Sequence, residues 1–384
     1  FYQNIMSSLI KKERKCYLSV PIMKAAMLND VNNIRRIITE DGNAVNYCHI
    51  SSGDTPLIVA ARHKSFEVLK ELLNFGAKIE CCNIDGKRSL HEAAYNGCLL
   101  CVEFLLNQGA QVDPLKRADW TPLMLACTKG NLDIVKLLVN AGANVQRKNK
   151  DGWTSFHISC REGFIDIMEY LVLIDNTLCF TVSNNKRTPL HTSSMHGKIE
   201  AVKFLLEKGC NPDVRDSCGS SPLMDALRFG FVSVAEVLIK TNLVLLDQVD
   251  NLGRYPLHIA AESGQVDSVK YLVEKCNADI NLKTKISGYT IFHLIAKEGH
   301  LELLNYLVND QSVNRCFKYL LNEPDANLRT PLHLSVASNK VRFAKMLIEL
   351  KCDQTLKDKF DKLAVNYALS QEMRDVVQIE LHVL

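Results

Sequence analysis

The stretch Arg187-Thr188-Pro189-Leu190-His191 decides the fold, because variants of it recur along almost the whole chain. A fuller copy reads Tyr255-Pro256-Leu257-His258-Ile259-Ala260-Ala261. The third position, usually proline, marks eleven copies at intervals of 33 to 40 residues. It is occupied by Pro21, Pro56, Ser89, Pro122, Ser155, Pro189, Pro222, Pro256, Ile291, Pro331 and Ala364. One short motif at this period predicts a stack of similar units rather than several globular domains.

The unit around Pro122 shows what each copy encodes. Thr121 is a good helix cap, and proline in the first turn needs no amide partner. Gly130 ends this helix, apolar residues at helical spacing from 134 to 139 form a second one, and Gly142 closes it. The motif resembles that of ankyrin repeats. It predicts an all-α, ankyrin-repeat solenoid of about eleven helix-turn-helix units, including degenerate terminal caps.

The repeat also sets the expected domain organisation. Residues 1–20 precede the first unit and are expected to form a poorly ordered N-terminal tail, and 21–384 a single array. The units at Pro21 and Ala364 lack parts of the motif and are interpreted as caps. The 40-residue interval holds an insertion of about seven residues near 311–325, expected to emerge as a loop. That loop is either a partner contact or a tolerated surface insertion.

Composition narrows the function classes. Net charge is +3, from 46 basic and 43 acidic residues, which gives no bulk case for direct nucleic-acid or membrane binding. No run approaches the length of a membrane span, and the N-terminus lacks the features of a secretory signal. Most of the fourteen cysteines are scattered singly, and the Cys98–Cys101 pair has no second pair to complete a zinc site. We expect reduced thiols in a cytoplasmic or nuclear protein.

No catalytic constellation is visible in the sequence. There is no Gly-rich phosphate loop and no GxSxG elbow, and His91-Glu92-Ala93-Ala94-Tyr95 fails the HExxH zinc pattern at Tyr95. Six histidines recur at one motif position, which predicts a structural role in hydrogen bonding between adjacent turns. They are His91, His157, His191, His258, His293 and His333. We expect a protein that is not an enzyme and needs neither cofactor nor metal.

Two tryptophans depart from the repeat. Trp120 and Trp153 are the only ones in the chain and lie 33 residues apart, at the same position of adjacent units. The repeat places them on one edge, about 10 Å apart. They are either interface anchors for a protein partner or rings that cover the neighbouring turn.

Basic residues gather in the same region. From Leu115 to Lys150 there are seven basic and two acidic residues, a local charge of +5. The candidate partner-binding side chains on these turns are Arg117, Arg147, Lys186 and Arg187, beside Lys116, Lys148 and Lys150. Such a surface suits an acidic protein surface or a phosphate-bearing ligand, although a chance excess of solvated lysines has the same composition.

Part of the chain goes further than the ordinary repeat. The segment Leu115-Lys116-Arg117-Ala118-Asp119-Trp120-Thr121-Pro122-Leu123-Met124 resembles the ankyrin repeat domain-containing protein 16 family. So do Lys148-Asn149-Lys150-Asp151-Gly152-Trp153 and Asp216-Ser217-Cys218-Gly219. The resemblance covers roughly residues 50–360 and is strongest across 85–230.

The resemblance implies a non-enzymatic cofactor that binds the catalytic domain of alanyl-tRNA synthetase. It would capture misactivated serine on lysine side chains and so prevent Ser-for-Ala mistranslation. One family acceptor position matches Lys150, whereas Arg117 and Phe180 stand at two others; Lys116 and Lys148 are further candidates. The alternative is a generic ankyrin-repeat adaptor for another cytoplasmic or nuclear partner.

Overall fold

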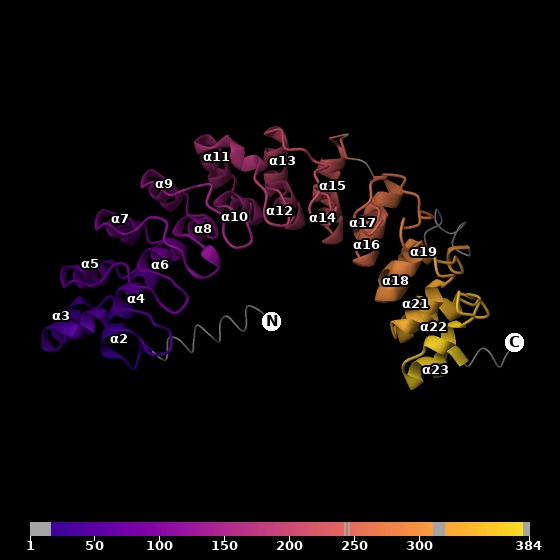
Figure 1. Cartoon of the computed structure of the whole chain (residues 1–384), viewed down its shortest axis with the longest axis horizontal. Coiled ribbons are helices and arrows are strands. Elements are labelled where there is room, and N and C mark those ends of the chain that lie inside the picture. Colours follow the sequence, from indigo (N-terminus) through magenta and orange to yellow (C-terminus); the bar gives the residue numbers. More distant parts are fainter. Residues whose placement is uncertain (1–16, 242, 245, 310–318, 379–384) are drawn as a thin grey trace. The chain divides into compact units, whose positions relative to one another are not determined.

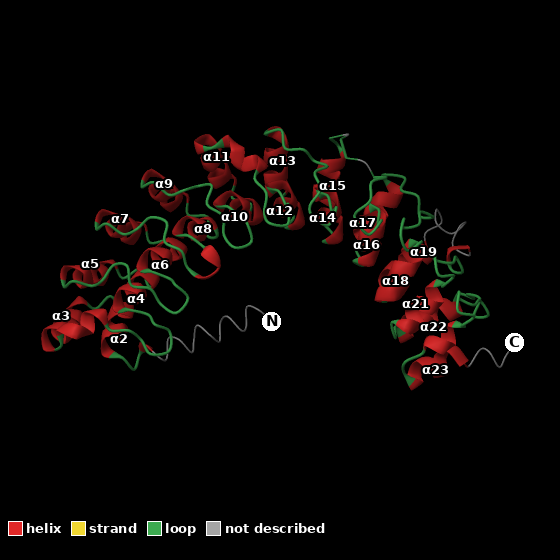
Figure 2. Cartoon of the chain, in the orientation of Figure 1, coloured by secondary structure: helices red, strands yellow, loops and turns green. Residues whose placement is uncertain are grey.

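The computed structural model describes residues 17–241, 243–244, 246–309 and 319–378, and these contain helices and turns but no strand. Figure 2 shows helices joined by loops throughout. The chain divides into two compact units, Phe1–Asn184 and Asn185–Leu384. An all-helical repeat fold is therefore confirmed for the described residues.

Unit 1 consists of helix pairs in two rows (Figure 1). The inner row contains α2 (Pro21–Leu28), α4 (Pro56–Arg62), α6 (Ser89–Asn96), α8 (Pro122–Cys127) and α10 (Ser155–Glu162). The outer row contains α3 (Val31–Glu40), α5 (Phe66–Asn74), α7 (Leu99–Asn107), α9 (Leu132–Asn140) and α11 (Ile165–Ile174). Short 3₁₀ turns lie at η1 (Gly42–Asn46), η2 (Arg117–Asp119) and η3 (Asn176–Phe180). Each helix contacts its pair partner and the next helix of its own row.

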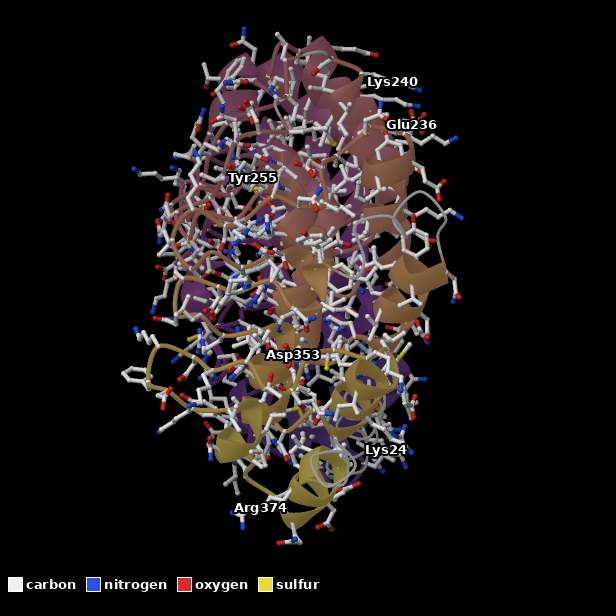
Figure 3. The ribbon with its side chains drawn as sticks, turned by 90° about the vertical axis from the view of Figure 1, so that its right-hand side faces the viewer. Lys24, Glu236, Lys240, Tyr255, Asp353 and Arg374 are labelled. Carbon is white, nitrogen blue, oxygen red and sulfur yellow. The ribbon has the colours of Figure 1, made fainter. Side chains whose placement is uncertain are left out.

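Unit 2 repeats this arrangement. Its inner elements are α12 (Pro189–Met195), α14 (Pro222–Arg228), α16 (Pro256–Glu262), α18 (Ile291–Glu298), α21 (Pro331–Ala337) and the 3₁₀ turn η4 (Ala364–Tyr367). Its outer helices are α13 (Ile199–Glu207), α15 (Val232–Ile239), α17 (Val266–Glu274), α19 (Leu301–Asn309), α22 (Val341–Glu349) and α23 (Gln371–Gln378). Figure 3 shows Glu236 of α15 beside Lys240, with which it forms an exposed ion pair of 2.9 Å.

The motif begins the inner helices as the sequence predicts. The Thr121 hydroxyl accepts a hydrogen bond from the Met124 amide at 3.2 Å, and Pro122 fills the first helical position. Ala126 on α8 and Leu138 on α9 are fully buried between the rows. Small side chains on the inner helices let their backbones approach closely, so the core lies between the two rows and continues from one pair to the next.

The motif histidines tie neighbouring repeats together. In unit 2, His191 Nδ1 accepts from the Thr188 amide at 3.2 Å, and its Nε2–H donates to the Ser220 carbonyl at 3.0 Å. The tautomer follows from the partners, since a carbonyl only accepts and an amide only donates. The same Nε2 bond to the following turn is formed by His91, His258, His293 and His333. The predicted bonding between turns is confirmed at these positions.

Part of the predicted tail lies within the described residues. Residues 1–16 fall outside the described part, but Tyr17 is buried and its hydroxyl donates to the Asp54 carboxylate. Tyr17 therefore packs against the repeats, and the order of the tail as a whole stays a prediction. The insertion predicted near 311–325 lies partly outside the described residues, and its role stays a prediction. Beyond the undescribed part, Leu320 and Leu321 are buried.

Candidate protein-binding surface

Backbone hydrogen bonds join the turns of unit 1 into one continuous edge. The Arg117 amide donates to the Asp85 carbonyl at 2.7 Å, and the Lys150 amide donates to the Ala118 carbonyl at 3.0 Å. Each bond links one turn to the turn before it. The turns that carry Trp120 and Trp153 are therefore direct neighbours on this edge, which we call the turn edge.

Trp120 is half-buried at the end of its turn. Its carbonyl accepts from the Lys116 amide at 3.0 Å and from His91 Nε2 at 3.2 Å, which fixes the backbone. The Lys116 ammonium lies 5.3 Å from the centre of the indole ring, a cation–π contact. The exposed part of the ring remains available to a partner.

Trp153 is also half-buried but packs differently. Its ring stacks on His157 with centroids 6.2 Å apart and an angle of 23° between the planes. The Arg161 guanidinium carbon lies 5.7 Å from the same ring. Both contacts come from α10 of its own repeat, so the Trp153 ring packs on that helix.

The turn at Lys116 departs from its neighbours in a way that the sequence reasoning missed. In the next turn, Asn149 Oδ1 accepts from two following backbone amides at 3.0 and 2.9 Å, and Gly152 adopts φ 79°. Lys116 occupies the position of Asn149 and offers no such acceptor. Ala118 and Asp119 then adopt φ 63° and 60°, where a side chain costs roughly 1–2 kcal/mol. The sequence indicates this strained turn, because Lys116 and Asp119 stand where the next turn has Asn149 and Gly152.

The candidate cations of unit 1 differ in how available they are. Lys150 and Lys148 are exposed, but the Lys148 ammonium donates to the Val182 carbonyl at 2.8 Å. The Arg117 side chain is 83% exposed and lies 3.6 Å from Asp85. Arg147 is half-buried. Lys150 is therefore the most accessible primary amine of this group.

Lys116 is half-buried. Burial, followed by the neighbouring Lys87 ammonium, lowers the pKa of Lys116. A lysine with a lowered pKa carries a larger neutral, nucleophilic fraction near neutral pH.

Two candidate cations belong to unit 2, and one of them faces inward. Lys186 is exposed, with φ 57°. The Arg187 guanidinium pairs with the buried carboxylate of Asp225 and lies 3.6 Å from Asp216. Burial raises the pKa of Asp225 to about 6. Arg187 compensates these buried carboxylates in unit 2, and its assignment as a partner contact stays a prediction. Phe180, at the end of η3 in unit 1, is exposed.

The described residues contain neither a metal-ligand cluster nor a helix of membrane-spanning length. No group of three or more His, Cys, Asp or Glu side chains in that part could hold a metal ion. Within the same residues, no helix is long and apolar enough to cross a membrane.

Comparisons with known proteins agree with this architecture. The family model described as ankyrin repeats (3 copies) matches residues 22–116, 112–179, 173–247, 190–284, 241–315 and 276–358. Human Rabankyrin-5 is 33% identical over 141 residues, which is 35% of this chain and 12% of that protein. The ANK repeat-containing protein nipk-1 of Caenorhabditis elegans is 29% identical over 178 residues, 42% of this chain and 28% of that protein.

A solved structure shares the fold. The ankyrin repeat domain of human ASB11 aligns with a TM-score of 0.51 and 27% identity, covering 57% of this chain and 97% of that domain. This chain covers only 12% of the length of Rabankyrin-5 and 28% of the length of nipk-1. Because the family model matches the chain from residue 22 to residue 358, this protein belongs to the ankyrin-repeat family, whose repeats are protein–protein interaction scaffolds.

Proposed function

We propose that this chain is a non-enzymatic cofactor of alanyl-tRNA synthetase that captures misactivated serine on lysine side chains. The observation that carries the proposal is the turn edge around Lys116–Trp120 and Asn149–Trp153. Its residues resemble the ankyrin repeat domain-containing protein 16 family beyond the ordinary repeat, and they place primary amines beside tryptophans. Its site of action is the cytoplasm, with the nucleus as a second compartment.

The chemistry needs only an amine held near the activated amino acid. In seryl adenylate, a mixed anhydride, the lysine nitrogen attacks the seryl carbonyl carbon and forms an amide. The bond from that carbon to the phosphate oxygen breaks, AMP leaves, and the proton lost from nitrogen passes to solvent. A free lysine with pKa near 10.4 is neutral only about once in a few thousand molecules at pH 7. Docking of the chain on the synthetase, beside the adenylate, compensates for this small neutral fraction, because it raises the effective concentration of the amine.

The structure supports an order among the candidate acceptors. Lys150 comes first, since its exposed side chain leaves a turn whose backbone is fixed to Ala118 and Asn149. Lys116 comes second, because its lowered pKa favours the neutral amine while partial burial limits its reach. Lys148 comes last, since its ammonium is hydrogen-bonded to the Val182 carbonyl.

Incubation with synthetase, serine and ATP is expected to give a seryl amide at Lys150, detected by peptide mapping. Lys150→Arg should remove that adduct while retaining synthetase binding, because arginine keeps the charge but offers no primary amine. Lys136→Arg, on the outer helix α9, is the matched control and should change neither. Binding without any seryl-lysine would reject the capture step and leave a binding partner only.

Trp120→Ala is expected to weaken synthetase binding by about 1–3 kcal/mol without changing the melting temperature. Trp153→Ala should weaken binding and also lower the melting temperature, because its ring packs on His157 and Arg161. Binding titrations and thermal denaturation of both variants test this. Leu173→Ala, an exposed position on α11, is the control for a general loss of surface area. Normal binding by both tryptophan variants would show that the rings only pack.

The alternative is an ankyrin-repeat adaptor that holds another partner through the same edge. The comparisons support this alternative, because Rabankyrin-5 and nipk-1 match this chain over only a minor part of their own length. Affinity purification with mass spectrometry separates the two candidates. Recovery of a different stoichiometric partner without alanyl-tRNA synthetase would favour the adaptor.

A further inference from the structure

A polar pocket of about 210 Å³ lies within unit 1, next to the strained turn. It is lined by Lys87, His91, Glu92, Tyr95, Lys116 and Leu125. The two lysines come from consecutive turns, whereas the histidine, glutamate and tyrosine come from α6 and the leucine from α8. The pocket therefore bridges two neighbouring repeats.

Two donors of this pocket have no partner among the described residues. The Lys116 ammonium has no hydrogen bond or ion pair there, and it lies over the Trp120 ring. The Tyr95 hydroxyl likewise lacks a hydrogen bond in this part of the chain. Lys87, the third donor, lies 3.1 Å from Glu92. The Lys116 side chain is half-buried and the Tyr95 side chain is exposed, so both donors are open to solvent or to a ligand.

The charge of the pocket favours an anion. Its single carboxylate, Glu92, is compensated by Arg62 at 3.2 Å as well as by Lys87. Burial lowers the pKa of His91 to about 4, so that imidazole is neutral, and both of its nitrogens are already bonded. A further cation, Lys129, lies 4.8 Å from the centre of the Tyr95 ring. The Lys116 ammonium thus forms no ion pair among the described residues, although the carboxylates of Asp85 and Glu92 attract it electrostatically.

We propose that the Lys87–Tyr95–Lys116 pocket binds the phosphate group of a small phosphomonoester. A phosphate monoester carries about −1.5 to −2 charges at neutral pH and three acceptor oxygens, which match two ammonium groups and one hydroxyl. A carboxylate can accept from several donors but carries only one negative charge, so it compensates two ammonium groups less well. The proposal does not depend on alanyl-tRNA synthetase, because it concerns the isolated chain.

Equilibrium dialysis with radiolabelled inorganic phosphate tests the proposal at fixed ionic strength and pH 7.5. One phosphate per chain is expected to bind, and the binding should saturate as the phosphate concentration is raised into the millimolar range. Lys116→Met, which keeps most of the side-chain length, should weaken it at least about tenfold, and Tyr95→Phe should weaken it measurably. Lys150→Met is the matched control on the next turn and should bind like the wild type. Thermal denaturation confirms that each variant is folded.

Competition identifies the ligand chemistry. AMP is expected to displace the labelled phosphate, whereas adenosine and acetate at the same concentration are not. Trp153→Phe leaves Trp120 as the only tryptophan, so its fluorescence should change with the same saturation curve, because Lys116 lies over its ring. Absence of saturable binding, unchanged binding in Lys116→Met, or equal displacement by acetate would overturn the proposal.

Discussion

Replacing Arg62 with alanine is expected to lower the free energy of unfolding by about 3–5 kcal/mol, because it leaves the buried carboxylate of Asp54 without its counterion and removes one of the two cations paired with Glu92. The guanidinium bonds both oxygens of Asp54, at 2.9 and 3.0 Å, and reaches Glu92 at 3.2 Å. The side chains of Asp54 and Glu92 are only 1% and 4% exposed. Tyr17 joins the same network, which thus ties the first described residue to two repeats.

The pKa shifts agree with this role. Burial is the largest single influence and raises the pKa of Asp54 and of Glu92, but their cationic neighbours and hydrogen bonds together, with Arg62 first among them, lower both pKa values. A carboxyl group whose pKa is lower in the folded state stabilises the protein above its unfolded pKa. This contribution is lost as the pH falls through the folded value. The cost of Arg62→Ala should therefore shrink in acid.

Chemical denaturation of Arg62→Ala and Arg35→Ala at pH 7.5 checks the prediction. Arg35 also pairs with a carboxylate on a neighbouring repeat, Glu71 at 2.8 Å, but its side chain is 58% exposed. Solvent screening should make that substitution nearly neutral. A similar effect of the two substitutions would contradict the account of a buried network.

Acidification from pH 7 to pH 4 is expected to destabilise the protein through its motif histidines. Burial lowers the pKa of His91, His191, His258 and His293 to about 4, from an ordinary value of 6.5. The folded state then binds fewer protons than the unfolded state between these values, so stability rises with pH across this window. The contribution is complete above pH 6.5 and is lost as the pH falls toward 4. Each histidine adds up to about 1.4 kcal/mol per pH unit.

Unfolding free energies measured from pH 4.5 to 7.5 test this in His191→Met. Methionine occupies the same motif position in the next repeat, at Met224, so the fold accepts it there. The variant should lose stability at neutral pH and show a shallower dependence on pH than the wild type. Met224→Leu, which removes no titrating group, should leave the slope unchanged. An unaltered slope in His191→Met would mean that this histidine titrates alike in both states.

The sequence predicted those features that each repeat encodes locally. Thr121 and Pro122 start α8 because a hydroxyl cap and a missing amide suit the first turn, whatever the neighbours do. Glycines such as Gly163, at φ 84°, end helices for an equally local reason. The histidine bonds were predictable because one residue type recurs at one position. These features need no knowledge of what a side chain meets in space.

Contacts between repeats were not predictable in the same way. Arg187 follows Lys186 in the sequence as a pair of basic residues. In the structure, the Arg187 guanidinium forms an ion pair with the Asp225 carboxylate, 38 residues away. Trp120 and Trp153 occupy equivalent positions of the repeat but have different neighbours. Lys116 lies over the ring of Trp120, whereas the ring of Trp153 packs on His157. The strained turn at Ala118 carried a local signal, since asparagine and glycine are missing there.

Isothermal titration calorimetry of this chain with the catalytic domain of alanyl-tRNA synthetase tests the central claim most directly. The account predicts saturable binding in the micromolar range or tighter, weakened by Trp120→Ala and unchanged by Leu173→Ala. Absence of binding by the folded wild-type chain, or equal binding by the two variants, would contradict it.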